Sequence, residues 1–288
     1  MRKTAFTFSI LAALAMAWAG LAGPSVPASD KPKAEDLVSK HLDALGTTEA
    51  RAALKSLNVE GNLLTKFLRG GSGLAGGPFS MVSTGHKILM EAKFNTPSYP
   101  GESYAFDGEK KTIGYVLPGQ RSQLEDFLNH NGEVLAEGLI GGTLSTAWAL
   151  YDWQSRNARL DVDGLKKVDG KELFRVSYHP RHGTGDLKIY LFFDPGTFRH
   201  VKTIYTEQGQ AQMGSTPGMS SVGGGANLTL EEDFGGFAPV NKLMLPTQWT
   251  LKYSQEGIGS GSSMVEFDMD IARIQANPNL SGVTFRIQ

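Results

Sequence analysis

The segment Val265-Glu266-Phe267-Asp268-Met269-Asp270-Ile271 puts four apolar side chains on one face of an extended chain and three carboxylates on the other. Successive side chains of a strand point to opposite faces, so this pattern predicts a strand with one buried and one solvated face. The same alternation recurs at residues 88–94, 111–117, 174–178, 187–193, 201–205 and 249–253. Strands of this kind are typical of antiparallel sheets.

Turn signals separate these segments. Asp-Gly pairs stand at residues 107–108, 163–164 and 169–170, where they favour hairpins or short loops. We count roughly ten to twelve strands in succession, without the strand–helix rhythm of a parallel sheet. The sequence therefore predicts a mainly β protein with a few helices, built on one large, strongly curved antiparallel sheet or barrel.

Helical spacing appears at two places. Residues 34–45 have one apolar face and end at Gly46, and a second, turn-rich segment runs over 49–57 behind a cap at Thr47 or Thr48. Residues 120–138 form a helical insert between strands, because Ser122 and Glu125 have the spacing of a capping box. We predict that this insert is a lid or plug, with Leu124, Phe127 and Leu128 facing the sheet.

The N-terminus has the features of a secretory signal. Arg2 and Lys3 precede an uncharged apolar run that ends among small residues, and this run is too short to span a membrane. We expect residues 1–22 to be a signal peptide, 23–33 a disordered linker and 34–288 a single domain. The mature chain is then periplasmic, or extracellular where no outer membrane exists, and it has no transmembrane segment.

Composition excludes several classes of function. The chain has 28 Lys and Arg against 29 Asp and Glu, a balance that argues against nucleic acid as a partner. It has no cysteine, which rules out disulfides, thiol chemistry and an acyl anchor on an N-terminal cysteine.

The chemical motifs are weak. Residues 71–76 spell GxGxxG, but a strand-like segment follows where a dinucleotide site needs a helix, so we interpret them as a hairpin loop. His179 and His182 lack an evident third ligand, and the acidic run 231–233 is typical of a solvated strand end. We therefore predict no metal, no cofactor and no catalytic residue.

The apolar strand faces remain as the candidate site. Most of these side chains are expected to be ordinary core, but a curved sheet with few helices could leave an apolar concavity that takes a lipid. Which residues line space and which fill it is left open. The candidate ligand-binding residues are Ile113, Tyr115, Phe174, Val176, Ile189, Leu191, Trp249 and Leu251.

Several segments together resemble a known family. They are Ala44-Leu45-Gly46, residues 53–57, Glu60-Gly61, and the later stretches 164–176, 187–194 and 198–201. In this order they are similar to the LolA-like, outer-membrane lipoprotein-sorting proteins, whose relatives include RseB-like domains. The resemblance implies an unclosed β-barrel covered by helices, and a role in carrying lipids or lipidated proteins through the periplasm or in sensing envelope stress.

Three hypotheses follow. The first is a non-enzymatic exported protein that binds an acyl chain, a lipid or a lipidated protein in a half-barrel, with a role in lipoprotein sorting as its specific form. The second is an envelope interaction or stress-sensing protein with a filled core, whose partners are envelope membrane proteins. The third is a hydrolase whose residues converge only in three dimensions.

Overall fold

The computed structural model describes residues 31–208, 227–257 and 261–287. The predicted signal peptide and the Gly-rich segment 214–225 lie outside the described residues. The helices are α1 (Ala34–Leu45), α2 (Thr48–Ala53), α3 (Gln123–His130) and α4 (Glu133–Ala136), with 3-10 turns η1 (Gly142–Leu144) and η2 (Ala149–Tyr151). The strands are β1 (Ser56–Arg69), β2 (Gly73–Thr84), β3 (Lys87–Lys93), β4 (Gly101–Phe106), β5 (Lys111–Ile113), β6 (Arg159–Val168), β7 (Lys171–His179), β8 (Lys188–Phe193), β9 (His200–Gln208), β10 (Asn227–Gly235), β11 (Ala238–Val240), β12 (Leu243–Leu245), β13 (Gln248–Gly257) and β14 (Gly261–Ala276).

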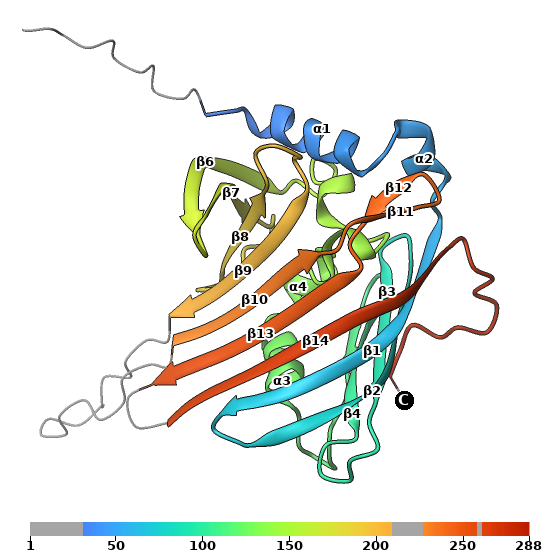
Figure 1. Cartoon of the computed structure of the whole chain (residues 1–288), viewed down its shortest axis with the longest axis vertical. Helices are drawn as coiled ribbons and strands as arrows, with labels where there is room; N and C mark the ends of the chain where they lie inside the picture. Colours follow the sequence, from blue (N-terminus) through green and yellow to red (C-terminus); the bar gives the residue numbers. More distant parts are fainter. Residues whose placement is uncertain (1–30, 209–226, 258–260, 288) are drawn as a thin grey trace, which may run out of the picture. The chain divides into compact units, whose positions relative to one another are not determined.

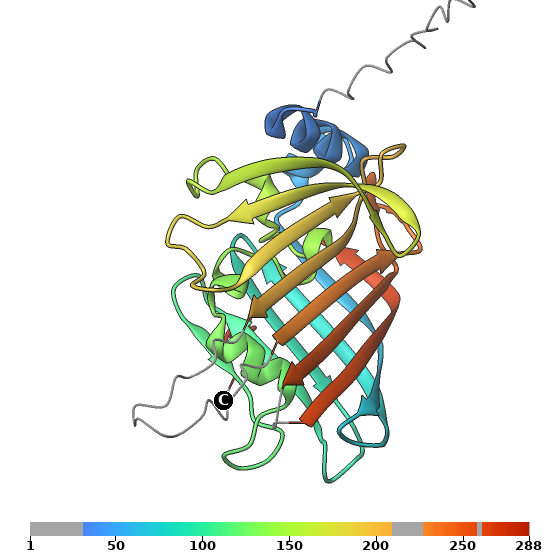
Figure 2. The same cartoon turned by 90° about the vertical axis from the view of Figure 1, so that its left-hand side faces the viewer.

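Twelve of these strands form one antiparallel sheet. Its order is β5-β4-β3-β2-β1-β14-β13-β10-β9-β8-β7-β6, so β5 and β6 are the two edges and do not pair with each other. The sheet is strongly curved and is not closed into a barrel (Figures 1 and 2). Strands β11 and β12 form a separate two-stranded sheet. The predicted mainly β fold, with one large curved antiparallel sheet, is confirmed.

The long strand β14 joins the two halves of the sheet. It pairs with β1 on one side and β13 on the other. Phe267 and Met269 point inward and are buried, while Glu266 and Asp268 point outward. Lys66 of β1 pairs with both carboxylates, with its Nζ 2.9 Å from Glu266. The alternation in residues 265–271 therefore sets which face of the sheet is buried.

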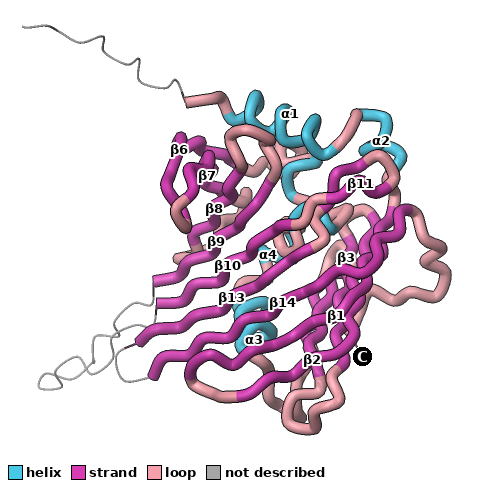
Figure 3. Tube along the Cα trace, viewed as in Figure 1, coloured by secondary structure: helices cyan, strands magenta, loops and turns pink. Residues whose placement is uncertain are grey.

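The concave face of the sheet is filled by the segment between β5 and β6. Figure 3 shows α3 and α4 inside the curve of the sheet. Leu124, Phe127 and Leu128 of α3 are buried in the same cluster as the inward side chains of the strands. Trp148, between η1 and η2, is also fully buried there. The predicted insert thus packs on the sheet as a plug, and its apolar face supplies the hydrophobic contacts that a single sheet lacks.

A buried carboxylate ties this plug to the sheet. Glu232 of β10 accepts hydrogen bonds from the backbone N–H of Gly141 at 2.8 Å, the indole of Trp249 at 2.9 Å and the hydroxyl of Tyr205 at 2.7 Å. Burial raises the pKa of Glu232 to about 7, and the three donors oppose that rise. Each donor would be unpaired in the core without this carboxylate.

Helix α1 is fixed through a buried histidine. His41 is within hydrogen-bond distance of the Phe198 carbonyl (3.1 Å), and it accepts a 3.1 Å hydrogen bond from the indole of Trp148. Because Nε2 accepts from Trp148, Nδ1 carries the proton and donates to Phe198. Next to this pair, His200 lies 2.9 Å from the hydroxyl of Thr203. Helix, plug and sheet therefore meet at one polar cluster inside an apolar core.

Three predictions of local structure are wrong. The pair Asp163-Gly164 forms no turn, because it lies within β6 at a β-bulge. The strand expected over 111–117 ends at Ile113, and the second helical segment, expected to reach Leu57, ends at Ala53. Leu57 instead lies in β1 and pairs with both β2 and β14, so tertiary pairing overrides local helical spacing there. Thr47 caps the helix as expected, and accepts from the Ala50 N–H at 3.2 Å. The GxGxxG segment lies in the β1–β2 hairpin, as predicted.

Candidate functional site

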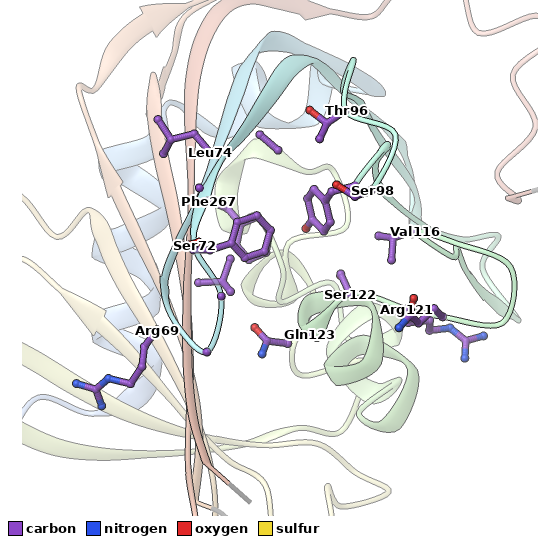
Figure 4. Close-up of a pocket in the computed structure, with 18 residues that line it drawn as sticks. Arg69, Ser72, Leu74, Thr96, Ser98, Val116, Arg121, Ser122, Gln123 and Phe267 are labelled. Atoms are coloured by element: carbon purple, nitrogen blue, oxygen red, sulfur yellow. The ribbon is translucent and has the colours of Figure 1, made fainter.

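An open groove lies between the end of the β1–β2 hairpin, the loop 94–100 and the loop that leads into α3. Its volume is about 570 Å³. Figure 4 shows Arg69 and Leu74 on one side of the groove and Val116 and Arg121 on the other. We call it the hairpin groove. A volume of this size is typical of small-molecule sites, which span roughly 300–1,000 Å³.

Aromatic side chains form the floor of the hairpin groove. The rings of Phe67 and Tyr99 meet edge to face, with centroids 5.2 Å apart, and Phe94 stacks on Tyr99 at 5.7 Å. Phe267 and Val265 of β14 also line the groove. Apart from Phe67, these side chains are buried. The floor is thus largely apolar, with Phe67, Val265 and Phe267 from the sheet and Tyr99 from the loop 94–100.

The wall on the α3 side is polar. Arg121 and Gln123 line the groove, and in the part of the chain that the structure describes, Arg121 Nε and Gln123 Oε1 are buried atoms without a hydrogen-bond partner. The Arg121 guanidinium lies 4.1 Å from the centre of the Tyr115 ring. Buried polar groups normally have partners, so the hydrogen-bonding capacity of these two atoms is unused at the groove wall.

A pair of carboxylates lies directly behind this wall. Glu102 of β4 accepts hydrogen bonds from the hydroxyls of Tyr99 and Ser122, two residues that line the groove. Glu125 completes the capping box, because its carboxylate accepts the Ser122 N–H while its own N–H donates to the Ser122 hydroxyl. The N-terminus of α3, the groove wall and β4 therefore share one hydrogen-bond network.

Burial raises the pKa of both carboxyl groups of this pair. Desolvation, together with the neighbouring charge of Glu125, raises the pKa of Glu102 to about 8, although the hydroxyls of Tyr99 and Ser122 lower it. Burial also raises the pKa of Glu125. Two carboxylates that share Ser122 disfavour each other's charge, so the pair retains a proton at neutral pH.

The candidate ligand-binding residues lie mostly in the packed core. Val176, Ile189, Leu191, Trp249 and Leu251 are almost fully buried, and Ile113 is buried as well. Phe174 is half-buried and stacks on Phe198. None of these residues lines the hairpin groove. Their role in ligand binding stays a prediction.

Tyr115 does not point inward. It was expected to continue the alternation of residues 111–117, but it is 55% exposed because the strand ends at Ile113. The sequence pattern did not predict the residues of the groove, for a related reason. They come from four segments that are far apart in sequence, and the loops among them have no periodic pattern. The one available signal was the inward position of Phe267 and Val265.

Other hollows on the described surface are lined by charged residues. One of about 520 Å³ is bordered by Glu109, Lys111 and Glu133, and one of about 380 Å³ by Asp169, Lys202 and Asp233. Lys202 is paired with these acids, with Nζ 3.2 Å from Asp169. Leu173, Val201 and Phe234 also line the second of these hollows, so its lining is mixed.

The histidines at positions 179 and 182 lie at the end of a hairpin. His179 Nε2 is 3.1 Å from Asp161. Among the residues that the structure describes, no group of three or more His, Cys, Asp or Glu side chains could hold a metal ion. Within the same residues, every helix is too short or too polar to span a bilayer.

Comparison with known proteins identifies similar folds. No family model and no curated protein matches the chain. A LolA superfamily protein from Nitrosomonas europaea is 14% identical, with a TM-score of 0.46, and the match covers 86% of this chain and 95% of that one. A structure described as an outer membrane lipoprotein-sorting protein domain, from Vibrio parahaemolyticus, is 11% identical, with a TM-score of 0.42 and the same coverage.

A third similar structure is a DUF1329 family protein from Desulfovibrio piger. It is 10% identical, with a TM-score of 0.39, and the match covers 87% of this chain and 94% of that one. Because each TM-score is below 0.5, the fold described above rests on the strand order and pairing of this chain. The solved structures that are similar to it include a LolA superfamily protein, which is the family that the sequence resembles.

Proposed function

We propose that this chain is an exported, non-enzymatic protein that binds the apolar chain of a lipid or of a lipidated protein in the hairpin groove. The observation that carries the proposal is the composition of the groove. An aromatic floor of Phe67, Tyr99 and Phe267 faces a wall in which Arg121 and Gln123 have buried polar atoms that find no partner among the described residues. An apolar chain that ends in a polar or anionic group matches both surfaces.

The packing of the core supports this location over the centre of the sheet. The plug segment fills the concave face, so a chain of several methylene groups would have to displace buried side chains there. The hairpin groove is already open and requires no displacement. Lipoprotein sorting is the specific form of this function that the family resemblance implies.

A fluorescent fatty acid tests the proposal. The mature protein should bind the probe saturably, and Ser98→Trp and Thr96→Trp should each weaken binding by filling the groove that both residues line. Ser281→Trp is the matched control, because Ser281 is exposed and lies outside the groove. The proposal fails if the wild type does not bind, or if the control weakens binding as much as the groove variants.

A second function has one observation in its favour. The filled concave face also suits an envelope interaction or stress-sensing protein that uses its outer surface and binds no lipid. Native mass spectrometry of protein purified from its host separates the two candidates. Co-purified lipid favours the first, and a lipid-free protein that also fails to bind the probe favours the second.

Export is part of the proposal and has its own test. It rests on Arg2, Lys3 and the apolar run that follows them. The intact mass of the envelope protein should show the loss of an N-terminal piece that ends between Ala19 and Ala28. Mature envelope protein that still carries Met1 contradicts this part of the proposal.

A further inference from the structure

Most of the exposed large apolar side chains of the described residues lie on segments that border the hairpin groove. Among the described residues, six large hydrophobic side chains are exposed, and five of them lie on the β1–β2 hairpin or on the loop 114–121. Those five are Leu64, Leu68, Leu74, Tyr115 and Leu117. Leu68 and Leu74 flank the hairpin turn and are 51% and 67% exposed. Clustered exposed apolar groups mark an interaction surface, whereas scattered ones do not.

The charge of the same region is one-sided. Three of the four segments that border the groove, 67–75, 94–100 and 114–121, contain no Asp or Glu and contain Arg69 and Arg121. The fourth, in β14, contains Glu266, which points outward and is paired with Lys66. The whole chain has nearly equal numbers of acidic and basic residues, so the lack of acids here is local. Arg69 lies 3.7 Å from Glu256 of β13, but both side chains are more than half exposed and the pair is weak.

The hairpin turn also allows close approach to a flat surface. Residues 70–73 are Gly-Gly-Ser-Gly, so Ser72 supplies the one side chain of this turn, and Arg69 and Leu74 flank it. The hairpin turn and the loop before α3 lie at the same end of the sheet, opposite to α1 and α2 (Figures 1 and 2).

We infer that this end of the protein docks on a bilayer with anionic headgroups. Leu68, Leu74 and Leu117 would enter the headgroup–acyl boundary, Tyr115 would lie at the interface, and Arg69 and Arg121 would contact the phosphates. A bilayer fits this rim, because exposed leucines beside arginines match an acyl interior that lies beneath anionic headgroups. The inference goes beyond ligand binding, because docking would place the mouth of the groove against the membrane.

Vesicle flotation tests the inference. The mature protein should bind vesicles of phosphatidylglycerol mixed with phosphatidylcholine, and should bind vesicles of phosphatidylcholine alone more weakly. Leu68→Ser and Leu117→Ser change one residue on each side of the rim, and neither residue lines the groove. Together they should weaken binding to the anionic vesicles by about tenfold or more, since each leucine loses apolar burial. Arg69→Gln should weaken binding to the anionic vesicles only, and added salt should reduce that difference.

The control is Leu165→Ser. Leu165 is the sixth exposed residue, 41% exposed, and it lies on the edge strand β6 far from the groove. It should leave vesicle binding unchanged. The inference is overturned if the wild type does not bind anionic vesicles, if the double variant binds like the wild type, or if Leu165→Ser weakens binding equally. Titration with the fluorescent fatty acid in solution separates the two proposals, because the double variant should still bind this probe although it binds vesicles weakly.

Discussion

The hydroxyl of Ser122 donates a 2.7 Å hydrogen bond to the carboxylate of Glu102, and so joins the first turn of α3 to strand β4. The same hydroxyl accepts the N–H of Glu125 at 3.0 Å as the helix cap. One side chain therefore closes the helix, orients a buried carboxylate and forms part of the groove wall. Changes at either residue should affect both the stability of the plug and the shape of the groove.

Ser122→Ala should lower the free energy of unfolding by about 2–3 kcal/mol, because it removes both a helix cap and a hydrogen bond to a buried carboxylate. Thr47→Ala is the matched control. Thr47 caps α2 through one hydrogen bond to the Ala50 N–H, so its loss should cost about 1 kcal/mol. Urea unfolding measures both values, and equal losses would show that the contact with Glu102 contributes nothing.

Glu102 should make the protein less stable as the pH rises. Its folded-state pKa is raised from 4.5 to about 8, so the folded protein binds more protons than the unfolded chain between these values. Its contribution to stability is complete below pH 4.5 and is lost as the pH rises through 8. Between pH 6.5 and 8 the wild type should lose stability relative to Glu102→Gln, because the folded Glu102–Glu125 pair still holds a proton that the unfolded carboxyl groups have released. Parallel stability curves for the two proteins contradict the raised pKa.

His41 should make the protein less stable as the pH falls, which is the opposite of the effect of Glu102. Burial lowers the pKa of its imidazole to about 4, so between pH 4 and 6.5 the unfolded chain binds the extra proton. The stability that His41 contributes is therefore complete above pH 6.5 and is lost as the pH falls toward 4. His41→Gln retains both hydrogen-bonding positions without titrating, so its stability should fall less over this range. Thermal unfolding at intervals of pH compares the two slopes, and identical slopes would remove His41 as the cause.

The hydrogen bonds that Glu232 accepts should be essential for stability, whereas its negative charge should not be. Glu232→Leu leaves the Gly141 N–H, the Trp249 indole and the Tyr205 hydroxyl buried without a partner, and should cost about 3–6 kcal/mol. Glu232→Gln can accept from two of these donors and donate to Tyr205, so it should cost much less. Urea unfolding followed by tryptophan fluorescence measures both. A leucine variant as stable as the wild type would mean that the plug is held by apolar contacts alone.

Leu191→Asp and Trp249→Asp should unfold the protein. Both side chains are fully buried beneath the plug, where a carboxylate costs several kcal/mol to desolvate. Leu165→Asp, at an exposed position, should leave the far-ultraviolet circular dichroism and the unfolding midpoint nearly unchanged. If Leu191→Asp is folded but loses the fatty-acid probe, the ligand site lies inside the sheet and the hairpin groove is the wrong location.

The sequence by itself determined the class of the fold and much of its local structure. Period-two alternation in residues 265–271 identified the buried face of β14, and the spacing of Ser122 and Glu125 identified the cap of α3. Both signals are local, because a strand's pleat and a helix's first turn are set by residues a few positions apart. The same alternation failed at Tyr115, where the strand stops and no ladder continues to fix the orientation of the side chain.

Only the tertiary structure decided what fills the sheet and where space remains. The helical spacing of residues 120–138 predicted a plug, but no local pattern predicted that Trp148 joins it in the core, or that Glu232 accepts the N–H of Gly141, 91 positions away. The hairpin groove likewise brings Phe67, Tyr99, Arg121 and Phe267 together from separate loops and strands. Such positions follow from the packing of the whole chain, because side chains far apart in sequence compete for one interior volume, and the pattern of a single segment does not contain the outcome.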